Sequence, residues 1–481
     1  MKKLYSVEDV ENLSIENVFD LYKKYINFSQ VELISSFGFG QDLIDKAEGM
    51  YIYTKDGKKI LDFTGGVGVL NHGHNHPRIL KIRQEYSKKM KMEVHKNYFS
   101  PHLAALSSNI ASLLPDKLNY SYFQNSGAEA VEGALKLAYK FHNGERDLVL
   151  SSDISFHGKT IAASNITNSI ETSYFKFQET LKNDKFIYNS IESIRNKVLE
   201  HTINGKLNIY AIVIEPFSAS SLKACSEKFL KELRKICSDY KIVLIFDEVY
   251  SGWFKTGKIF NFLQYVNLVP DILVTSKSLG GGKSSISAYI CTNEIFSKAY
   301  GNLKDATLHS TTFNGYGEET VTAIESINIM IEDNYEEKSQ KNGKLISQEL
   351  ELLRLKYADM ILETKGSGCL HGIFFDSKIL KKTTQFFSKI LPISFLKDDQ
   401  AMFKLLCASV IFHLYKNYNI LTYYGSNLGI PLKVSPSVIA SEDQIKFFFE
   451  SLDKTLKIGF YKLLLDFTKN KILNKVKGNL T

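Results

Sequence analysis

The run Ile242-Val243-Leu244-Ile245-Phe246 leads directly into the acidic pair Asp247-Glu248. A second run of the same kind, Tyr210–Ile214, ends at Glu215. Short, continuous runs of β-branched and apolar residues are typical of strands buried on both faces of a parallel sheet. Apolar residues at helical spacing, as between Val131 and Ala138, alternate with these runs. The alternation predicts an α/β fold, a sandwich with a mostly parallel sheet.

The pattern changes after about residue 332, where the chain becomes richer in helical spacing. Strand-like pieces follow at Gly372–Asp376 and Leu432–Val434. We therefore predict a large domain over residues 85–330 and a smaller α+β domain over residues 331–481, to which the N-terminal segment 1–84 contributes.

Composition excludes several classes of protein. The 481 residues are 44% apolar and 12% aromatic, which excludes a disordered chain, and 29 glycines with 8 prolines exclude a collagen-like one. No apolar run approaches the ~18 residues of a membrane span, and the N-terminus turns acidic without an apolar signal segment. The five cysteines are odd in number and widely spaced, so we expect no disulfide framework and a cytoplasmic location.

The excess of positive charge is local. Residues 454–481 carry seven lysines and one acid, which accounts for +6 of the chain's net +8. The remainder is near neutral, so we expect no nucleic-acid partner. Leu456, Phe460 and Leu463 follow helical spacing in this tail. The tail predicts an amphipathic terminal helix docked on its own domain, and a membrane-surface or anionic partner is the alternative.

Candidate site residues follow the predicted strands. Ligands bind at the carboxyl ends of parallel strands, which places Glu215 and Asp247 at the expected site. A buried carboxylate such as Asp247 needs a cationic or proton-bearing partner. A protonated heteroaromatic nitrogen would serve, and so would a structural ion pair. Lys277 follows another strand-like run, and a lysine there can form a Schiff base if it loses its proton, or can be an ordinary loop lysine.

Two loop motifs complete the candidates. Ser126-Gly127 opens the helical stretch, where a helix N-terminus can bind an anion or the serine can simply cap the helix. Phe156-His157 could stack on a flat ring or form a surface turn. The glycine run that ends in Lys283-Ser284 is no phosphate-binding P-loop, because position 277 is lysine where that motif has glycine.

A different class of function remains open at this stage. His72, His74 and His76 alternate along the chain and would share one face of a strand. Such a cluster could serve a metal hydrolase, although no set of carboxylates completes the site.

Taken in order, these motifs resemble the class III pyridoxal-phosphate-dependent aminotransferases of fold type I. The matching stretches are Asp62–Gly66, Gly73–Pro77, Asn125–Ala130, Phe156–Gly158, Glu215-Pro216, Phe246–Val249, the segment around Lys277, and Thr311–Phe313. The resemblance implies pyridoxal 5'-phosphate as cofactor, amino-group transfer with ping-pong kinetics, and a homodimer with composite active sites. Small-molecule amines and carbonyl compounds would be the substrates. An aminomutase (of the glutamate-1-semialdehyde type), racemase or decarboxylase of the same fold, and a catalytically silent relative, stay open as alternatives.

The resemblance also implies roles for single residues. Lys277 corresponds to the Schiff-base lysine and Asp247 to the carboxylate that keeps the pyridine nitrogen protonated. Glu215 corresponds to the glutamate on the substrate side. Thr312 corresponds to the threonine that reaches the phosphate of the neighbouring subunit. The other cofactor contacts that it implies are Ser126, Gly127, Ala128, Phe156, His157, Val249 and Tyr250.

Two positions depart from the family pattern. Tyr250 stands where the family usually has glutamine, and its phenol can still donate a hydrogen bond. Lys433 stands where the family often has an arginine that binds the substrate α-carboxylate. Lysine cannot form the bidentate fork of arginine. Lys433 therefore favours a substrate such as an ω-amine, a diamine or an aminated carbonyl compound such as a sugar.

Overall fold

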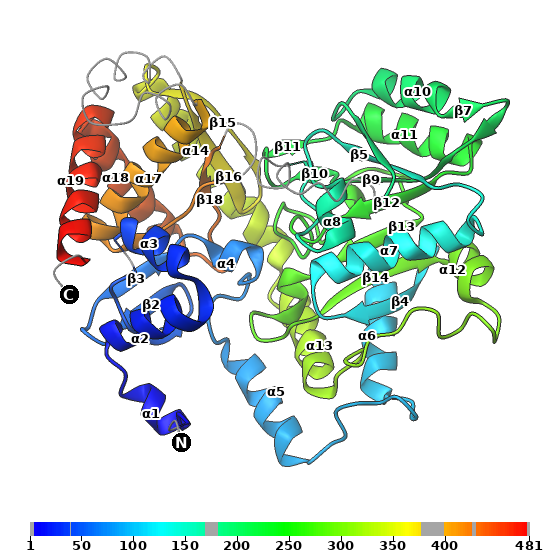
Figure 1. Cartoon of the computed structure of the whole chain (residues 1–481), viewed down its shortest axis with the longest axis horizontal. Helices are drawn as coiled ribbons and strands as arrows, with labels where there is room; N and C mark the ends of the chain where they lie inside the picture. Colours follow the sequence, from blue (N-terminus) through cyan, green and yellow to red (C-terminus); the bar gives the residue numbers. More distant parts are fainter. Residues whose placement is uncertain (1–3, 39, 169–180, 377–398, 426–429, 479–481) are drawn as a thin grey trace.

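The chain folds into two lobes (Figure 1). Its computed structural model describes residues 4–38, 40–168, 181–376, 399–425 and 430–478. The middle of the chain forms one lobe around a large sheet, while the N-terminal and C-terminal parts form the other lobe together.

A seven-stranded sheet forms the centre of the first lobe, in the order β4-β14-β13-β12-β9-β5-β6. Its strands are β4 (Leu118–Gln124), β5 (Leu148–Ser152), β6 (Asn183–Phe186), β9 (Ile209–Ile214), β12 (Val243–Asp247), β13 (Ile272–Thr275) and β14 (Ser287–Thr292). Within this sheet β14 runs antiparallel to both of its neighbours, β13 and β4, and the other neighbouring strands are parallel to each other. The two apolar runs of the sequence are the neighbouring parallel strands β9 and β12, so the predicted α/β fold with a mostly parallel sheet is confirmed.

Helices cover both faces of this sheet. Val213 and Ile245 lie in one core with α7 (Gly127–Phe141), whereas Ile212 and Leu244 lie in the opposite core with α10 (Ile191–Glu200) and α11 (Glu227–Asp239). Successive side chains of a strand point to opposite faces, and here both faces are apolar, which explains the uninterrupted runs. The lobe also contains α5 (Pro77–Lys88), α6 (Pro101–Ser112), α8 (Ile161–Ile166), α12 (Asn293–Tyr300), α13 (Gly317–Glu332), and the short strands β7 (Thr202–Ile203), β8 (Lys206–Leu207), β10 (Phe217–Ser218) and β11 (Lys223–Ala224).

The second lobe joins the two ends of the chain. Strand β17 (Ile420–Leu421) runs parallel to β3 (Lys59–Asp62), and Phe63 stacks on Phe448 with ring centroids 4.1 Å apart. Its other strands are β1 (Ile44–Glu48), β2 (Tyr51–Thr54), β15 (Ile361–Ser367), β16 (Leu370–Phe375) and β18 (Leu432–Val434). Its helices are α1 (Val7–Glu11), α2 (Ile15–Tyr22), α3 (Phe28–Ser36), α4 (Gly65–Gly68), α14 (Tyr335–Lys356), α17 (Asp399–Tyr418), α18 (Glu442–Lys457) and α19 (Phe460–Gly478). A π-helical turn, Lys23–Asn27, links α2 to α3.

This pairing supports the proposed division into residues 1–84, 85–330 and 331–481, in which the N-terminal segment completes the smaller domain. Helix α5 spans the first of these boundaries and contacts α13 of the large lobe. We keep the boundaries as a proposal.

Three further sequence predictions concern the whole chain. Phe460, Leu463 and Leu464 of α19 are buried in the core of the second lobe, so the terminal helix docks on its own lobe as expected. The five cysteines are all buried and unpaired. No helix within the described residues has both the length and the apolar character needed to cross a bilayer.

Candidate functional site

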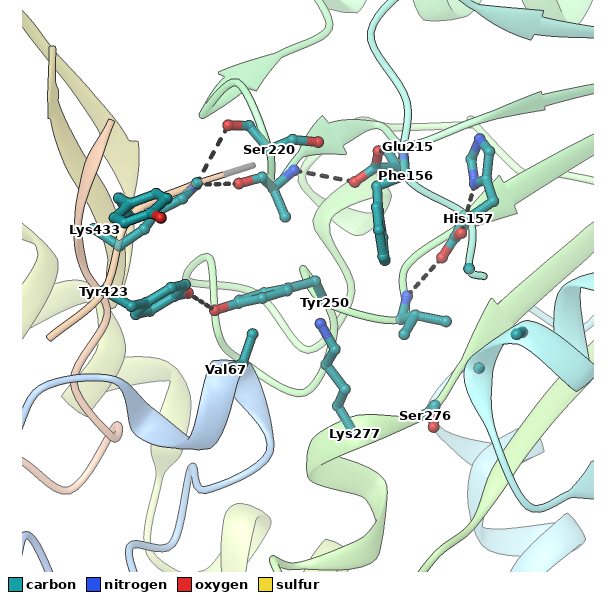
Figure 2. Close-up of a pocket in the computed structure, with 18 residues that line it drawn as sticks. Val67, Phe156, His157, Glu215, Ser220, Tyr250, Ser276, Lys277, Tyr423 and Lys433 are labelled. Carbon is teal, nitrogen blue, oxygen red and sulfur yellow. Dashed lines mark hydrogen bonds and ion pairs between the residues drawn. The ribbon is translucent and has the colours of Figure 1, made fainter. Parts of the chain in front are cut away.

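A cavity of about 410 Å³ opens at the carboxyl ends of the central strands, between the two lobes (Figure 2). Most residues predicted for the site line this cavity. They are Gly127, Ala128, Phe156, His157, Glu215, Asp247, Val249, Tyr250, Lys277 and Lys433. The ends of β9, β12 and β13 bring their side chains together, as the parallel sheet predicts.

Lys277 directs its amino group into this cavity (Figure 2). The residue follows β13 and has a positive φ of 49°, a conformation that L-residues adopt at a cost and that is frequent at functional sites. Its Nζ lies 3.5 Å from the centroid of the Tyr250 ring. Burial lowers the pKa of Lys277 to about 7, although Asp247 and Glu215 oppose this shift. A substantial share of Lys277 is therefore neutral at physiological pH, as a nucleophile or base requires.

Asp247 is buried and forms two polar contacts. Its Oδ2 lies 2.7 Å from Nδ1 of His157, and its Oδ1 accepts a hydrogen bond of 3.0 Å from the Val249 N–H. The backbone N–H of His157 donates to the hydroxyl of Thr167, which holds the histidine in place. The adjacent Glu248 points away from the cavity and accepts from the N–H groups of Asn261 and Phe262. One carboxylate of the pair therefore faces the site, and the other holds the following loop.

Glu215 lies at the end of β9 and is also buried. Its two carboxylate oxygens accept hydrogen bonds from the backbone N–H groups of Phe156, at 3.0 Å, and Ala219, at 3.1 Å. Burial raises the pKa of Glu215 to about 7, while His157 opposes this shift. Glu215 can therefore exchange a proton near neutral pH.

Side chains from the second lobe close the other side of the cavity. The hydroxyls of Tyr250 and Tyr423 lie 2.5 Å apart, and the Tyr250 hydroxyl lies 3.3 Å from that of Ser435. Lys433 is buried, which lowers its pKa to about 7. Its amino group donates to the backbone carbonyls of Ala219 and Ser220. The Tyr250 hydroxyl is therefore hydrogen-bonded to the second lobe through Tyr423 and Ser435, and Lys433 joins the second lobe to the first.

The start of α7 forms one end of the cavity wall. Ser126 is exposed and caps the helix, because its hydroxyl bonds both the N–H and the carboxylate of Glu129. The first N–H groups of a helix have no partner within the helix, which leaves those of Gly127 and Ala128 suited to an anion. A Cβ on Gly127 would lie 2.9 Å from Val249, so only glycine allows this close approach.

These features fit a flat heteroaromatic ring with a phosphate group. A phosphate can bind at the start of α7, Asp247 can face a protonated ring nitrogen, and Lys277 can reach an aldehyde. Phe156 is 38% exposed within the cavity wall and offers an aromatic face. The His157 side chain is fully buried behind Asp247, and its Nδ1 contact fixes the carboxylate that faces the cavity.

Two of the predicted site residues, Ser126 and Thr312, do not line this cavity. Ser126 adjoins it at the start of α7, whereas Thr312 lies apart from it. It is exposed in the loop before α13 and is not among the residues that line the cavity.

The three histidines do not form a metal site. They lie in the turns that lead into α5, not on a strand, and both ring nitrogens of His72 are engaged, with the hydroxyls of Tyr335 and Ser326. His74 pairs instead with Asp62 at 2.8 Å. Among the described residues, the single group with metal-ligand geometry is Asp184, Glu200 and His201, and Lys197 already pairs with Asp184 at 2.7 Å. The histidine hypothesis of a metal hydrolase is wrong.

Several residues of the cavity carry no signal in the sequence. They are Val67, Ala219, Ser220, Tyr423, Tyr424 and Gly425. Gly158 and Ser276, which also line the cavity, lie inside the motifs around Phe156 and Lys277 but were not predicted as contacts. The tyrosines follow a strand of two residues, too short for a period of two to be detected.

Comparisons with known proteins agree with this geometry. The family model described as aminotransferase class-III matches residues 40–456. A transaminase from the marine bacterium Virgibacillus is similar in structure, with 19% identity, a TM-score of 0.77, and coverage of 93% of this chain and 99% of that one. A Toxoplasma gondii ornithine aminotransferase structure with partial occupancy of PLP at its active site has 20% identity and a TM-score of 0.76, over 97% and 100% of the two chains. An acetylornithine aminotransferase from Elizabethkingia anophelis has 22% identity and a TM-score of 0.68, over 92% and 99%.

The lowered pKa of Lys277 predicts how the stability of the ligand-free chain depends on pH. Between the folded pKa of about 7 and the ordinary 10.5, the unfolded chain binds more protons at this position, so its contribution to stability rises with pH. We expect Lys277→Met to raise the urea midpoint most near pH 7, and the gain to shrink toward pH 10. Lys283→Met, at an exposed position nearby, serves as the control. A gain that does not change with pH would contradict the prediction.

Proposed function

This chain belongs to the class III aminotransferase family, and from that premise we propose that it transfers amino groups with an ω-amine, a diamine or an aminated carbonyl compound, such as an amino sugar, as its favoured substrate. The chain is a transaminase, and its cofactor is pyridoxal 5'-phosphate. An ordinary amino acid such as glutamate would serve in the other half of a ping-pong reaction.

The position of Lys433 is the observation that carries this substrate class. Its ammonium donates to two backbone carbonyls, at Ala219 and Ser220. No arginine lines the cavity within the described part of the chain. A substrate α-carboxylate is recognised best by a bidentate guanidinium. A cavity without that group supports a substrate whose reacting carbon carries no carboxylate.

The walls of the cavity fit such a substrate. Tyr423 and Tyr424 provide aromatic surface, and Val67 adds an aliphatic side chain. These groups can bind an amine by apolar contact, while the few polar groups orient it. The cavity thus offers an amine substrate an apolar surface, whereas the α-carboxylate of an amino acid would need a fixed cation.

The chemical roles follow from the protonation states. When bound, pyridoxal 5'-phosphate supplies an aldehyde that condenses with amines and a ring that accepts the electron pair released at the substrate carbon. Lys277, neutral in part near pH 7, would bond that aldehyde and would carry a proton to and from the substrate carbon. Asp247 would hold the ring nitrogen protonated, with His157 holding Asp247 in place. Glu215 would exchange a proton or a hydrogen bond on the substrate side.

The remaining cofactor contacts are proposed from the same placement. The N–H groups of Gly127 and Ala128 would bind the phosphate, with Ser126 fixing the start of α7. Phe156 would stack on the ring. Val249 and Tyr250 line the cavity beside Asp247.

We further propose a homodimer in which Thr312 enters the site of the partner. Thr312 lies outside its own cavity in a loop with exposed apolar side chains, including Leu303, 99% exposed, and Phe313, 51% exposed. Exposed apolar groups gathered in one loop favour a protein interface. A second copy of the chain would cover them and bring the Thr312 hydroxyl to the phosphate.

A half-reaction comparison tests the substrate class. Norleucine and pentylamine differ only in the α-carboxylate, so we expect pentylamine to convert the bound cofactor at least about tenfold faster at equal concentration. The visible absorbance of the cofactor in single turnovers is the measurement. Conversion by norleucine alone would contradict the proposal. Release of carbon dioxide, or an isomer formed without an acceptor, would indicate a decarboxylase or mutase instead.

Co-expression of two inactive variants tests the composite site. We expect Asp247→Asn and Thr312→Glu each to fold and to lose at least about 10²-fold in turnover, because one removes a key charge and the other repels the phosphate. A mixed dimer would keep one site free of both changes, so random pairing would restore about a quarter of wild-type activity.

Asp247→Asn paired with Lys277→Ala is the control for this experiment. Both of those residues belong to one chain's site, so no mixed dimer has an intact site and no activity should return. If Asp247→Asn and Thr312→Glu also fail to complement each other, Thr312 does not act across the interface.

A further inference from the structure

Lys433 joins the two lobes beside the cavity. It lies on β18 of the second lobe, is 3% exposed, and directs its ammonium at the turn between β10 and β11 of the first lobe. The ammonium donates to the carbonyl of Ala219 and, at 3.4 Å, to that of Ser220. A buried ammonium is costly unless such acceptors surround it. Both carbonyls belong to the same turn, which fixes that turn to β18.

Ala219 links this contact to Glu215. Its carbonyl accepts from Lys433, while its own N–H donates to Oε2 of Glu215 at 3.1 Å. The other carboxylate oxygen of Glu215 is held by the N–H of Phe156. A shift of Ala219 would therefore move one of the two donors that orient Glu215.

Apolar side chains at the two ends of the turn between β10 and β11 also pack against the second lobe. Phe217 and Leu222 share a small core with Leu370 and Phe374 of β16. The approach is close, since a Cβ on Gly372 would lie 2.5 Å from Leu222. By contrast, the buried hydroxyls of Ser220 and Ser221 have no hydrogen-bond partner within the described residues. Tyr188 and Ser218 hold the two ends of the turn by hydrogen bonds, and the amino group of Lys433 is the side-chain donor that bonds the carbonyls at its tip.

From this geometry we infer that Lys433 is a positioning residue for Glu215, which it orients through Ala219, and that it is not a ligand of the substrate carboxylate. The inference rests on the proposed function of the cavity. It predicts that loss of the ammonium slows the reaction of every amine, with or without a carboxylate, because the effect passes through Glu215.

A double-mutant cycle on the holoenzyme tests this inference. We expect Lys433→Met to slow single-turnover conversion by pentylamine at least about fivefold, because small displacements of a reacting group are costly. In a Glu215→Gln background the same change should slow it less than about twofold, since residues that act as a unit are not additive. Equal effects in both backgrounds, or no effect of Lys433→Met in the wild type, would overturn the inference.

Lys255 provides a matched control for the cycle. It is a second fully buried lysine whose ammonium donates to backbone carbonyls, those of Ser435 and Pro436, and it does not line the cavity. Lys255→Met removes a comparable buried amino group that does not contact the turn of Ala219, so its effect should be the same in both backgrounds. If Lys433→Met does not yield folded protein, Lys433→Gln replaces it, because the glutamine amide donates to a carbonyl without a charge.

A comparison of the two amines separates positioning from carboxylate binding. Positioning predicts that Lys433→Met slows pentylamine and norleucine by the same factor. A larger loss for norleucine alone would identify Lys433 as a carboxylate ligand and overturn the inference. The substrate proposal is judged separately, on the preference of the wild-type enzyme, so either claim can fail while the other stands.

Discussion

Burial of charged groups at the carboxyl edge of the central sheet is the constraint on which the site depends. The side chains of Lys277, Asp247 and Glu215 are buried there. Burying the charged form of any one of them without a partner would cost free energy. Asp247 is stabilised by His157 and a backbone N–H, and Glu215 by two backbone N–H groups. Lys277 has the aromatic face of Tyr250, and burial still lowers its pKa to about 7. The fold thus produces a neutral amine and a proton-holding carboxyl near neutral pH.

Side chains of the second lobe complete the site that lies at the edge of the central sheet. Tyr423 meets the hydroxyl of Tyr250, whose ring contacts Lys277, and Lys433 meets the turn that holds Glu215. Both central groups of the site are therefore coupled to the relative position of the two lobes. This coupling explains why a strand of three residues far along the chain, β18, bears on chemistry at the end of β9.

The sequence predicted features that depend on local pattern. The apolar runs identified β9 and β12, and their last residues identified Glu215 and Asp247, because a strand end fixes where a side chain lies. It could not predict the partners of Lys433, since backbone carbonyls leave no trace in a sequence. The capping by Ser126 was detectable, because Glu129 follows it at the spacing of a capping box. The prediction of a histidine metal site was wrong because the alternation of the histidines suggests a strand, whereas the chain turns there.

We propose that Lys277 forms the covalent link to pyridoxal 5'-phosphate. Borohydride reduction of the holoenzyme, followed by peptide mapping, tests it most directly. The lowered pKa and the position of Lys277 in the cavity predict a single label on the peptide that contains this residue. A label on Lys255, Lys283 or Lys433, or a cofactor that washes away after reduction, would contradict the account.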